Sequence, residues 1–198
     1  METISDILYW ISTGLLVPVI VALIFLFIRA LMLIGTFFGQ YVALRKSSRQ
    51  IRQALSCTDN SALDDVVAKL PRRTGTLVVT YAKKMIEARA NAAEVDRLFA
   101  EYEIEADRDL GTSKMLSKLG PMLGLMGTLI PMGPALAGLA SGDIESMARN
   151  MQVAFATTVT GLVAAAIGYI TQQVKRRWYQ QDLINLEYLA QIIKNDKR

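Results

Sequence analysis

The sequence predicts an all-α integral membrane protein with three transmembrane helices and long cytoplasmic helical extensions. Hydrophobic residues make up 52% of its 198 residues, and they gather in blocks. Two blocks, residues 119–142 and 150–174, contain no Asp, Glu, Lys or Arg, and a third over residues 7–44 contains a single charge. Because a helix needs about 20 apolar residues to cross the hydrocarbon core, each block is long enough for one crossing.

The first element is an extracytoplasmic N-terminus followed by a transmembrane helix, over residues 1–44. Its one charge is Arg29, so we place the crossing near residues 13–38 and expect the helix to continue past the membrane. The acidic start METISD lacks the basic region of a cleaved signal peptide, and we expect the segment to stay in the mature protein. Arg29 is predicted to reach the lipid headgroups; a functional intramembrane charge is the alternative.

The second element is a cytoplasmic helical domain over residues 45–118. A short helix over residues 61–70 should end before Pro71, and Cys57 is expected to be a solvated or half-buried thiol on the cytoplasmic side. Residues 76–109 predict one long helix with a narrow apolar stripe, which should pack on neighbouring helices or on other subunits. The stripe recurs at three and four residues: Leu77, Tyr81, Met85, Ala88, Ala92, Val95, Phe99 and Tyr102.

The remaining elements are a helical hairpin and a tail. Transmembrane helix 2 is predicted over residues 119–141, an extracytoplasmic loop over 142–149, and transmembrane helix 3 over 150–174. Residues 175–198 predict a cytoplasmic amphipathic helix, with Leu186 and Ile193 on its apolar face.

The charges that flank the crossings give the orientation. Lys and Arg mark the cytoplasmic ends of membrane helices. They follow the first block at Arg45 and Lys46 and the third at Lys175 to Arg177, whereas Glu2 and Asp6 precede the first. We therefore expect the N-terminus outside and the C-terminus in the cytoplasm. The net charge of +4 then reflects topology, and no nucleic-acid partner is expected.

Both later crossings have a face of small residues. One interpretation is close helix packing, for which Gly120 and Gly124 have the familiar spacing. The other is a lined pathway, since Pro131 and Pro134 free backbone carbonyls at membrane depth, which is tolerated where protein or water covers them. The small faces are Gly120, Gly124, Gly127, Thr128, Pro131, Ala135 and Gly138 on the second crossing, and Ala154, Thr157, Thr158, Gly161, Ala164, Ala165, Gly168 and Thr171 on the third.

Several functions are excluded or disfavoured. The chain contains no His, so His-based zinc sites and proton relays are impossible, and we predict no enzyme activity, no cofactor and no metal. Neither of the two later crossings contains Asp, Glu, Lys or His, the side chains that usually relay protons through membranes. If the protein moves ions, their charged carrier must come from another subunit.

Two motifs then resemble a known family. The run from Gly120 to Leu129, followed by the run from Ala154 to Ala165, is similar to the paired signature of the MotA/TolQ/ExbB proton channel family. The chain departs from TolQ and ExbB at Val153, where those proteins carry Glu, and from MotA in having three crossings rather than four. It therefore looks like a divergent, three-span branch.

The resemblance implies a function. Members form homopentamers around two copies of a single-span partner of the ExbD, TolR or MotB type, whose transmembrane Asp carries H⁺, or possibly Na⁺. They sit in the inner (plasma) membrane and act as stators that turn ion flow into rotation or force. The family's pore threonines correspond to Thr128 and Thr158, and the predicted lining also includes Thr157, Gly161, Gly127 and Ala165. The predicted packing residues are Gly120, Gly124, Pro131, Gly138 and Gly168.

A non-conducting oligomeric membrane scaffold is the alternative function. In that case the glycine faces would serve only helix packing, and the cytoplasmic helices would recruit cytoplasmic or envelope partners.

Overall fold

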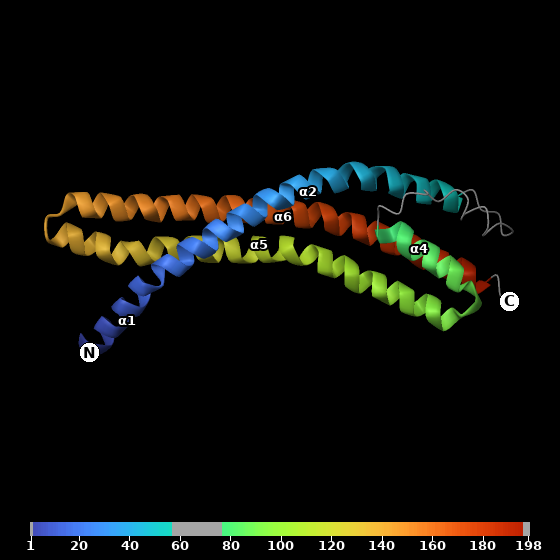
Figure 1. Cartoon of the computed structure of the whole chain (residues 1–198), viewed down its shortest axis with the longest axis horizontal. Coiled ribbons are helices and arrows are strands. Elements are labelled where there is room, and N and C mark those ends of the chain that lie inside the picture. The colour runs from blue at the N-terminus through green and yellow to red at the C-terminus, as the bar shows by residue number, and fades with distance from the viewer. Residues whose placement is uncertain (1, 57–76, 196–198) are drawn as a thin grey trace. The chain divides into compact units, whose positions relative to one another are not determined.

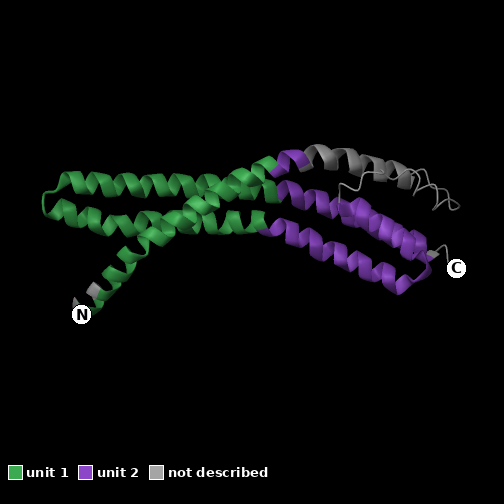
Figure 2. Ribbon diagram, in the orientation of Figure 1, with its two compact units in different colours: residues 1–35, 112–172 green, residues 36–111, 173–198 purple. Residues whose placement is uncertain are grey.

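The computed structural model describes residues 2–56 and 77–195. The predicted helix over residues 61–70, Pro71 and Cys57 lie outside these residues. The chain divides into two compact units (Figure 2). Unit 1 comprises residues 1–35 and 112–172, and unit 2 comprises residues 36–111 and 173–198.

Every described element is a helix, which agrees with the predicted class (Figure 1). Within residues 2–56 and 77–195, three helical segments are long and apolar enough to cross a membrane: Ile7–Gly39, Ala92–Ala140 and Ile144–Lys194. The elements are α1 (Glu2–Gly14), α2 (Leu16–Ser56), α4 (Leu77–Glu87), a 3₁₀ turn (Ala88–Ala90), α5 (Ala92–Ala140) and α6 (Ile144–Asn195).

The first apolar block forms two helices, with a break at Leu15. Pro18 accounts for the break. It has no N–H to donate to the carbonyl of Gly14, four residues earlier, and its ring would collide with that carbonyl in a continuous helix. Pro18 is tolerated in the first turn of α2, and α2 then runs to Ser56, well past residue 38 as predicted.

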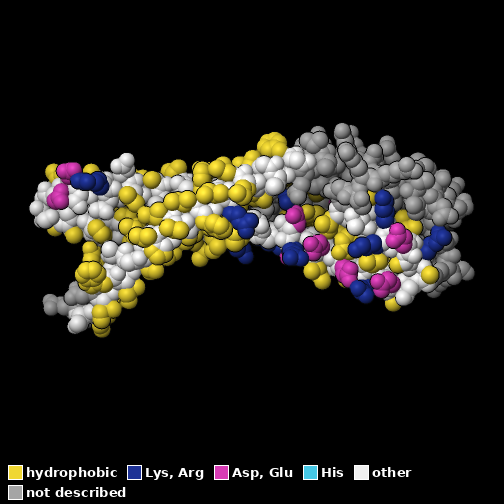
Figure 3. Space-filling view, in the orientation of Figure 1, with side chains coloured by type: hydrophobic (Ala, Val, Ile, Leu, Met, Phe, Trp, Pro, Cys, Tyr) yellow, Lys and Arg dark blue, Asp and Glu magenta, His cyan; other side chains and the backbone are white. Residues whose placement is uncertain are grey.

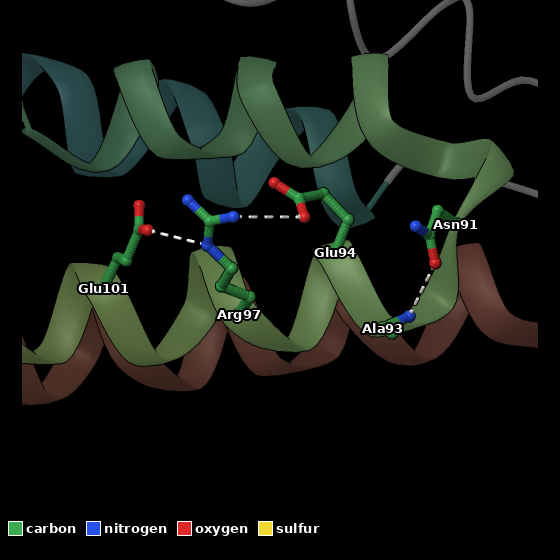
Figure 4. A network of polar contacts seen from close by, with 5 residues as sticks. All are labelled: Asn91, Ala93, Glu94, Arg97 and Glu101. Atoms are coloured by element: carbon green, nitrogen blue, oxygen red, sulfur yellow. Dashed lines mark hydrogen bonds and ion pairs between the residues drawn. The ribbon is translucent and has the colours of Figure 1, made fainter.

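The predicted single helix over residues 76–109 is wrong at its centre. The chain leaves helical geometry at Asn91, whose φ and ψ are −129° and 104°. The Asn91 side-chain oxygen accepts a hydrogen bond from the Ala93 N–H at 3.2 Å (Figure 4), which is how Asn begins a helix. Apolar periodicity continues across the break and therefore hid it. Further along, Arg97 pairs with Glu94 and Glu101 on the helix surface.

The tail over residues 175–198 does not begin a separate helix. α6 is unbroken from Ile144 to Asn195, because no Gly or Pro interrupts it after Gly168. At Lys175 the sequence changes from apolar to charged, but the backbone stays helical. Likewise, α5 passes Gly111 without ending and contains Pro121, Pro131 and Pro134.

The turn between α5 and α6 is only residues 141–143, so residues 144–149, predicted as loop, begin α6. Gly142 has a φ of 76°, the left-handed conformation that closes many helices. The Asp143 N–H then donates to the Gly138 carbonyl at 2.8 Å. The Asp143 carboxylate accepts from the Ser146 N–H at 2.9 Å, which caps α6.

Each unit has its own core. In unit 2, α4, α5 and α6 bury Met85, Tyr102 and Leu186 together, which confirms that the apolar stripe packs on neighbouring helices. In unit 1, α2 contributes Leu26, Ala30 and Leu33 to a cluster with residues of α5 and α6. Figure 3 shows hydrophobic side chains covering unit 1, whereas charged side chains gather over unit 2 and over the turn between α5 and α6.

Candidate functional site: a glycine-packed helix pair

In unit 1, α5 and α6 approach each other so closely that neither Gly120 nor Gly161 has room for a Cβ. A Cβ on Gly161 would lie 2.6 Å from the Gly120 carbonyl oxygen and 2.9 Å from the Gly124 Cα. A Cβ on Gly120 would in turn lie 2.7 Å from the Gly161 carbonyl oxygen. Real Cβ atoms do not approach backbone this closely. The small faces of the two predicted crossings therefore meet each other within one chain, as small residues do in membrane helix pairs.

The contact extends in both directions along the pair. A Cβ on Gly168 would lie 2.6 Å from the Leu116 Cβ, and one on Gly127 would lie 2.6 Å from the Thr157 Cβ. Gly138 lies at the turn, where a Cβ would meet the Asp143 carbonyl oxygen at 3.2 Å. Pro131 and Ala135 are buried on the same face of α5.

A proline and a threonine form a polar link inside this contact. Pro131 has no N–H, so the Gly127 carbonyl, four residues earlier, loses its helical donor. The Thr157 hydroxyl of α6 donates to that carbonyl, with an oxygen–oxygen distance of 2.9 Å. Its single proton is shared with the carbonyls of Val153 and Ala154 on α6, at 3.0 and 2.9 Å. Thr157 is 8% exposed and Gly127 is buried, so this link is shielded from bulk water.

We expect Thr157→Val to destabilise the helix pair by about 0.5–2 kcal/mol, because it leaves the Gly127 carbonyl unsatisfied. Pro131→Ala restores an N–H that can bond this carbonyl, so Thr157→Val should matter less in that background. Thermal unfolding of the four proteins of this double-mutant cycle in one detergent measures the coupling. A coupling energy of zero would mean that the two side chains act independently.

Thr128 and Thr158 lie at the edge of the contact, which the Thr158 backbone reaches at Gly124. Thr128 comes directly after Gly127 on α5, and Thr158 comes directly after Thr157 on α6; Gly127 and Thr157 are both part of the contact. α5 and α6 run antiparallel. Viewed from the same end, a step of one residue toward the C-terminus therefore rotates clockwise on one helix and counterclockwise on the other, and both steps lead to the same side of the helix pair. Both threonines are half-buried, and their hydroxyls donate to the carbonyls of Leu125 and Ala154 at 2.7 and 3.0 Å. Their oxygens keep the capacity to accept a hydrogen bond.

α2 packs on the opposite side of the pair. Its cluster includes Leu123 and Ile167, which precede Gly124 and Gly168 by one residue. By the same geometry, one residue back on each helix leads to the side away from the two threonines. Within unit 1, α2 therefore leaves the threonine side to other contacts.

The structure separates the predicted pathway residues into two groups. Gly127, Thr157, Gly161 and Ala165 are buried, and all four lie in the contact between α5 and α6. Thr128 and Thr158 are the half-buried pair at its edge. Lining of an ion pathway by any of the six stays a prediction.

The sequence analysis missed a polar cluster in unit 2. The Lys175 ammonium lies 2.8 Å from Asp109 Oδ2, and the Tyr179 hydroxyl donates to the same oxygen. Nearby, the Tyr102 hydroxyl faces Asp182 Oδ2 at 3.5 Å. Lys175 and Asp182 are each 2% exposed. The only sign of this cluster in the sequence is that Lys175, Tyr179 and Asp182 recur at helical spacing on the same face as the apolar residues of the predicted tail helix.

This cluster is surrounded by too many charged residues to lie in the hydrocarbon core of a membrane. Burial inside the protein nevertheless shifts the pKa values of its side chains. Desolvation raises the pKa of Asp182 to about 7, against a smaller lowering by its hydrogen bond from Tyr102. Desolvation also raises the pKa of Tyr102 and Tyr179 well above the ordinary tyrosine value, so both hydroxyls stay protonated and act as donors.

Arg29 points away from the core of unit 1. It is exposed, and its guanidinium carbon lies 5.7 Å from the centre of the Phe25 ring. Its assignment to lipid or to the membrane interface stays a prediction. Among residues 2–56 and 77–195, no group of three or more Cys, Asp and Glu side chains is arranged to hold a metal ion.

Comparison with known proteins gives two matches. The model of the MotA/TolQ/ExbB proton channel family matches residues 64–187. A curated protein of Methanothermobacter thermautotrophicus, named as a homologue of the biopolymer transport protein ExbB, is 34% identical over 86 residues. That match covers 40% of this chain and 31% of the relative, so the chain spans less than a third of the relative's length.

Proposed function

Because this chain belongs to the MotA/TolQ/ExbB proton channel family, we propose that it is the channel-forming, stator-type subunit of an ion-motive-force-driven complex. Five copies would surround two copies of a single-span partner that carries a transmembrane Asp. H⁺, or alternatively Na⁺, would pass along that Asp and drive rotation or force across the cell envelope. The proposed orientation in the inner membrane has the N-terminus outside and the C-terminus in the cytoplasm.

The observation that carries this proposal is the position of Thr128 and Thr158. The glycine contact holds α5 and α6 as one unit, and α2 packs on the side away from the threonines. If the threonine side faces the centre of a ring, each copy presents two hydroxyls whose oxygens can accept hydrogen bonds. The two crossings supply no charge of their own, so these hydroxyls suit a neutral wall around a carrier on another chain.

The buried members of the small faces have a supporting role in this proposal. Gly120, Gly124, Gly127 and Gly161 hold the pair at close distance, and Thr157 satisfies the carbonyl that Pro131 frees. These residues would keep Thr128 and Thr158 in register without touching the ion.

The test is the pair of variants Thr128→Val and Thr158→Val, which remove the hydroxyls and keep the side-chain shape. We expect each to retain assembly with the partner and to lower ion-driven work by at least about tenfold, the effect of about 1.4 kcal/mol on a barrier. Thr160→Val is the matched control, because Thr160 lies on another face and its hydroxyl bonds the Ala156 carbonyl. Normal flux in both variants would remove the assignment to the pathway wall.

Native mass spectrometry of the complex from its own host separates this proposal from the scaffold alternative. Five copies of this chain with two of a single-span, Asp-bearing protein are expected. Another stoichiometry, or copurification without such a partner, would favour a non-conducting scaffold.

A further inference from the structure

Two aspartates of unit 2 are buried to different degrees and have different partners. Asp109, with a side chain that is 33% exposed, forms an ion pair with Lys175 and accepts a bond from the Tyr179 hydroxyl. Asp182 is 2% exposed, and the one hydrogen bond that it accepts from a described side chain comes from Tyr102. None of the ion pairs among the described residues involves Asp182.

A carboxylate buried without a cation is unfavourable, and it is neutralised most simply by taking up a proton. At 3.5 Å, the contact with the Tyr102 hydroxyl is too long to offset the loss of water. Lys175 is already paired with Asp109, so it does not compensate Asp182.

The other groups around Asp182 do not change this balance. From α5 it faces Tyr102, with Asp109 beyond the Tyr179 hydroxyl, and from α6 it is flanked by Tyr179. On α4, Tyr81 packs edge-on against the ring of Tyr102, with centroids 5.6 Å apart. All three tyrosines are neutral at physiological pH. The Lys84 ammonium of α4 lies 5.1 Å from the centre of the Tyr81 ring, and none of the ion pairs among the described residues joins it to Asp182.

We propose that Asp182 is a proton-binding site inside unit 2, which takes one proton from solvent and thereby tightens the packing of α4, α5 and α6. Uptake converts the carboxylate into the neutral acid, and no other bond is made or broken. The inference concerns unit 2 alone and does not depend on the proposed channel.

The expected pH dependence has a definite sign. Because the pKa of Asp182 is raised from 3.8 to about 7 in the folded protein, the folded state binds more protons than the unfolded state within this window. Stability therefore falls as pH rises through the window and levels off above it.

The experiment is thermal unfolding of the full-length protein in detergent from about pH 5 to about pH 8, with infrared spectra at each pH. Wild type should lose stability toward high pH and show the C=O band of a protonated acid at neutral pH. Asp182→Asn should lack that band, keep a flatter profile and unfold at a higher temperature than wild type at about pH 8. Asp96→Asn, at an exposed surface pair with Lys194, is the control and should behave as wild type.

A second variant keeps the test decisive if Asp182→Asn does not fold. Tyr102→Phe removes the donor that favours the carboxylate, so the infrared titration should move to higher pH. If wild type has no acid band at neutral pH, or if Asp182→Asn keeps the wild-type pH profile, Asp182 is not a proton-binding site.

Discussion

Gly161→Ala is expected to destabilise the protein by about 2–3 kcal/mol, at the upper part of the range for overpacking in a dense interior. The added methyl group would lie 2.6 Å from the Gly120 carbonyl oxygen and 2.9 and 3.1 Å from the Gly124 Cα and N. All three are backbone atoms, which cannot rotate away as a flexible side chain can. The two helices must therefore separate, and contacts along the whole pair weaken together.

Gly35→Ala is the matched control for this experiment. Its Cβ would meet no atom within 4 Å, and Gly35 lies in the same unit, also within a helix. Alanine favours a helix over glycine, so this variant should be neutral or more stable by up to about 1 kcal/mol. Thermal unfolding in detergent compares the two. Equal stability of Gly161→Ala and wild type would show that α5 and α6 are farther apart in the membrane than this structure places them.

Asp109→Leu should be the most damaging change in unit 2, with a loss of about 3 kcal/mol. It leaves the Lys175 ammonium, whose side chain is 3% exposed, without its partner carboxylate. Removing one member of a buried ion pair typically costs about 3–5 kcal/mol, and the partial exposure of Asp109 places this case at the lower end.

The double variant Asp109→Leu with Lys175→Met tests the physical cause. It removes both charges, so most of the stability lost in Asp109→Leu should return. The exposed pair of Asp96 and Lys194 provides the control, since Asp96→Leu should change stability by less than about 1 kcal/mol. If the double variant is no more stable than Asp109→Leu, a buried charge is not the reason for the loss.

The sequence predicts the helical class and the apolar blocks well. A block of residues without charge, such as 119–142 or 150–174, is a local property, and its length alone shows that it can cross a membrane. The small faces of α5 and α6 also follow from helical periodicity within each segment. The paired motifs around Thr128 and Thr158 identified the family, to which the chain belongs.

Boundaries within long helical regions were harder to predict. The apolar stripe runs without change of period through Asn91, yet the chain breaks there and its side chain caps α5. The opposite error occurred at Lys175, where composition changes sharply and the helix continues. Periodicity and composition report the environment of the side chains. A helix ends, however, where its backbone N–H and C=O groups find other hydrogen-bond partners.

The sequence by itself determined that this is a helical membrane protein of a proton channel family, with three segments that are long and apolar enough to cross a membrane and small-residue faces on two of them. Only the tertiary structure decided how those faces are used: Gly127, Thr157 and Gly161 lie inside the α5–α6 contact, whereas Thr128 and Thr158 lie at its edge. It also decided that Asp109 has a cation and Asp182 has none among the described residues. The physical reason is that burial and pairing depend on which faces of distant helices meet, and residues such as Asp109 and Lys175, 66 positions apart, carry no local sign of each other.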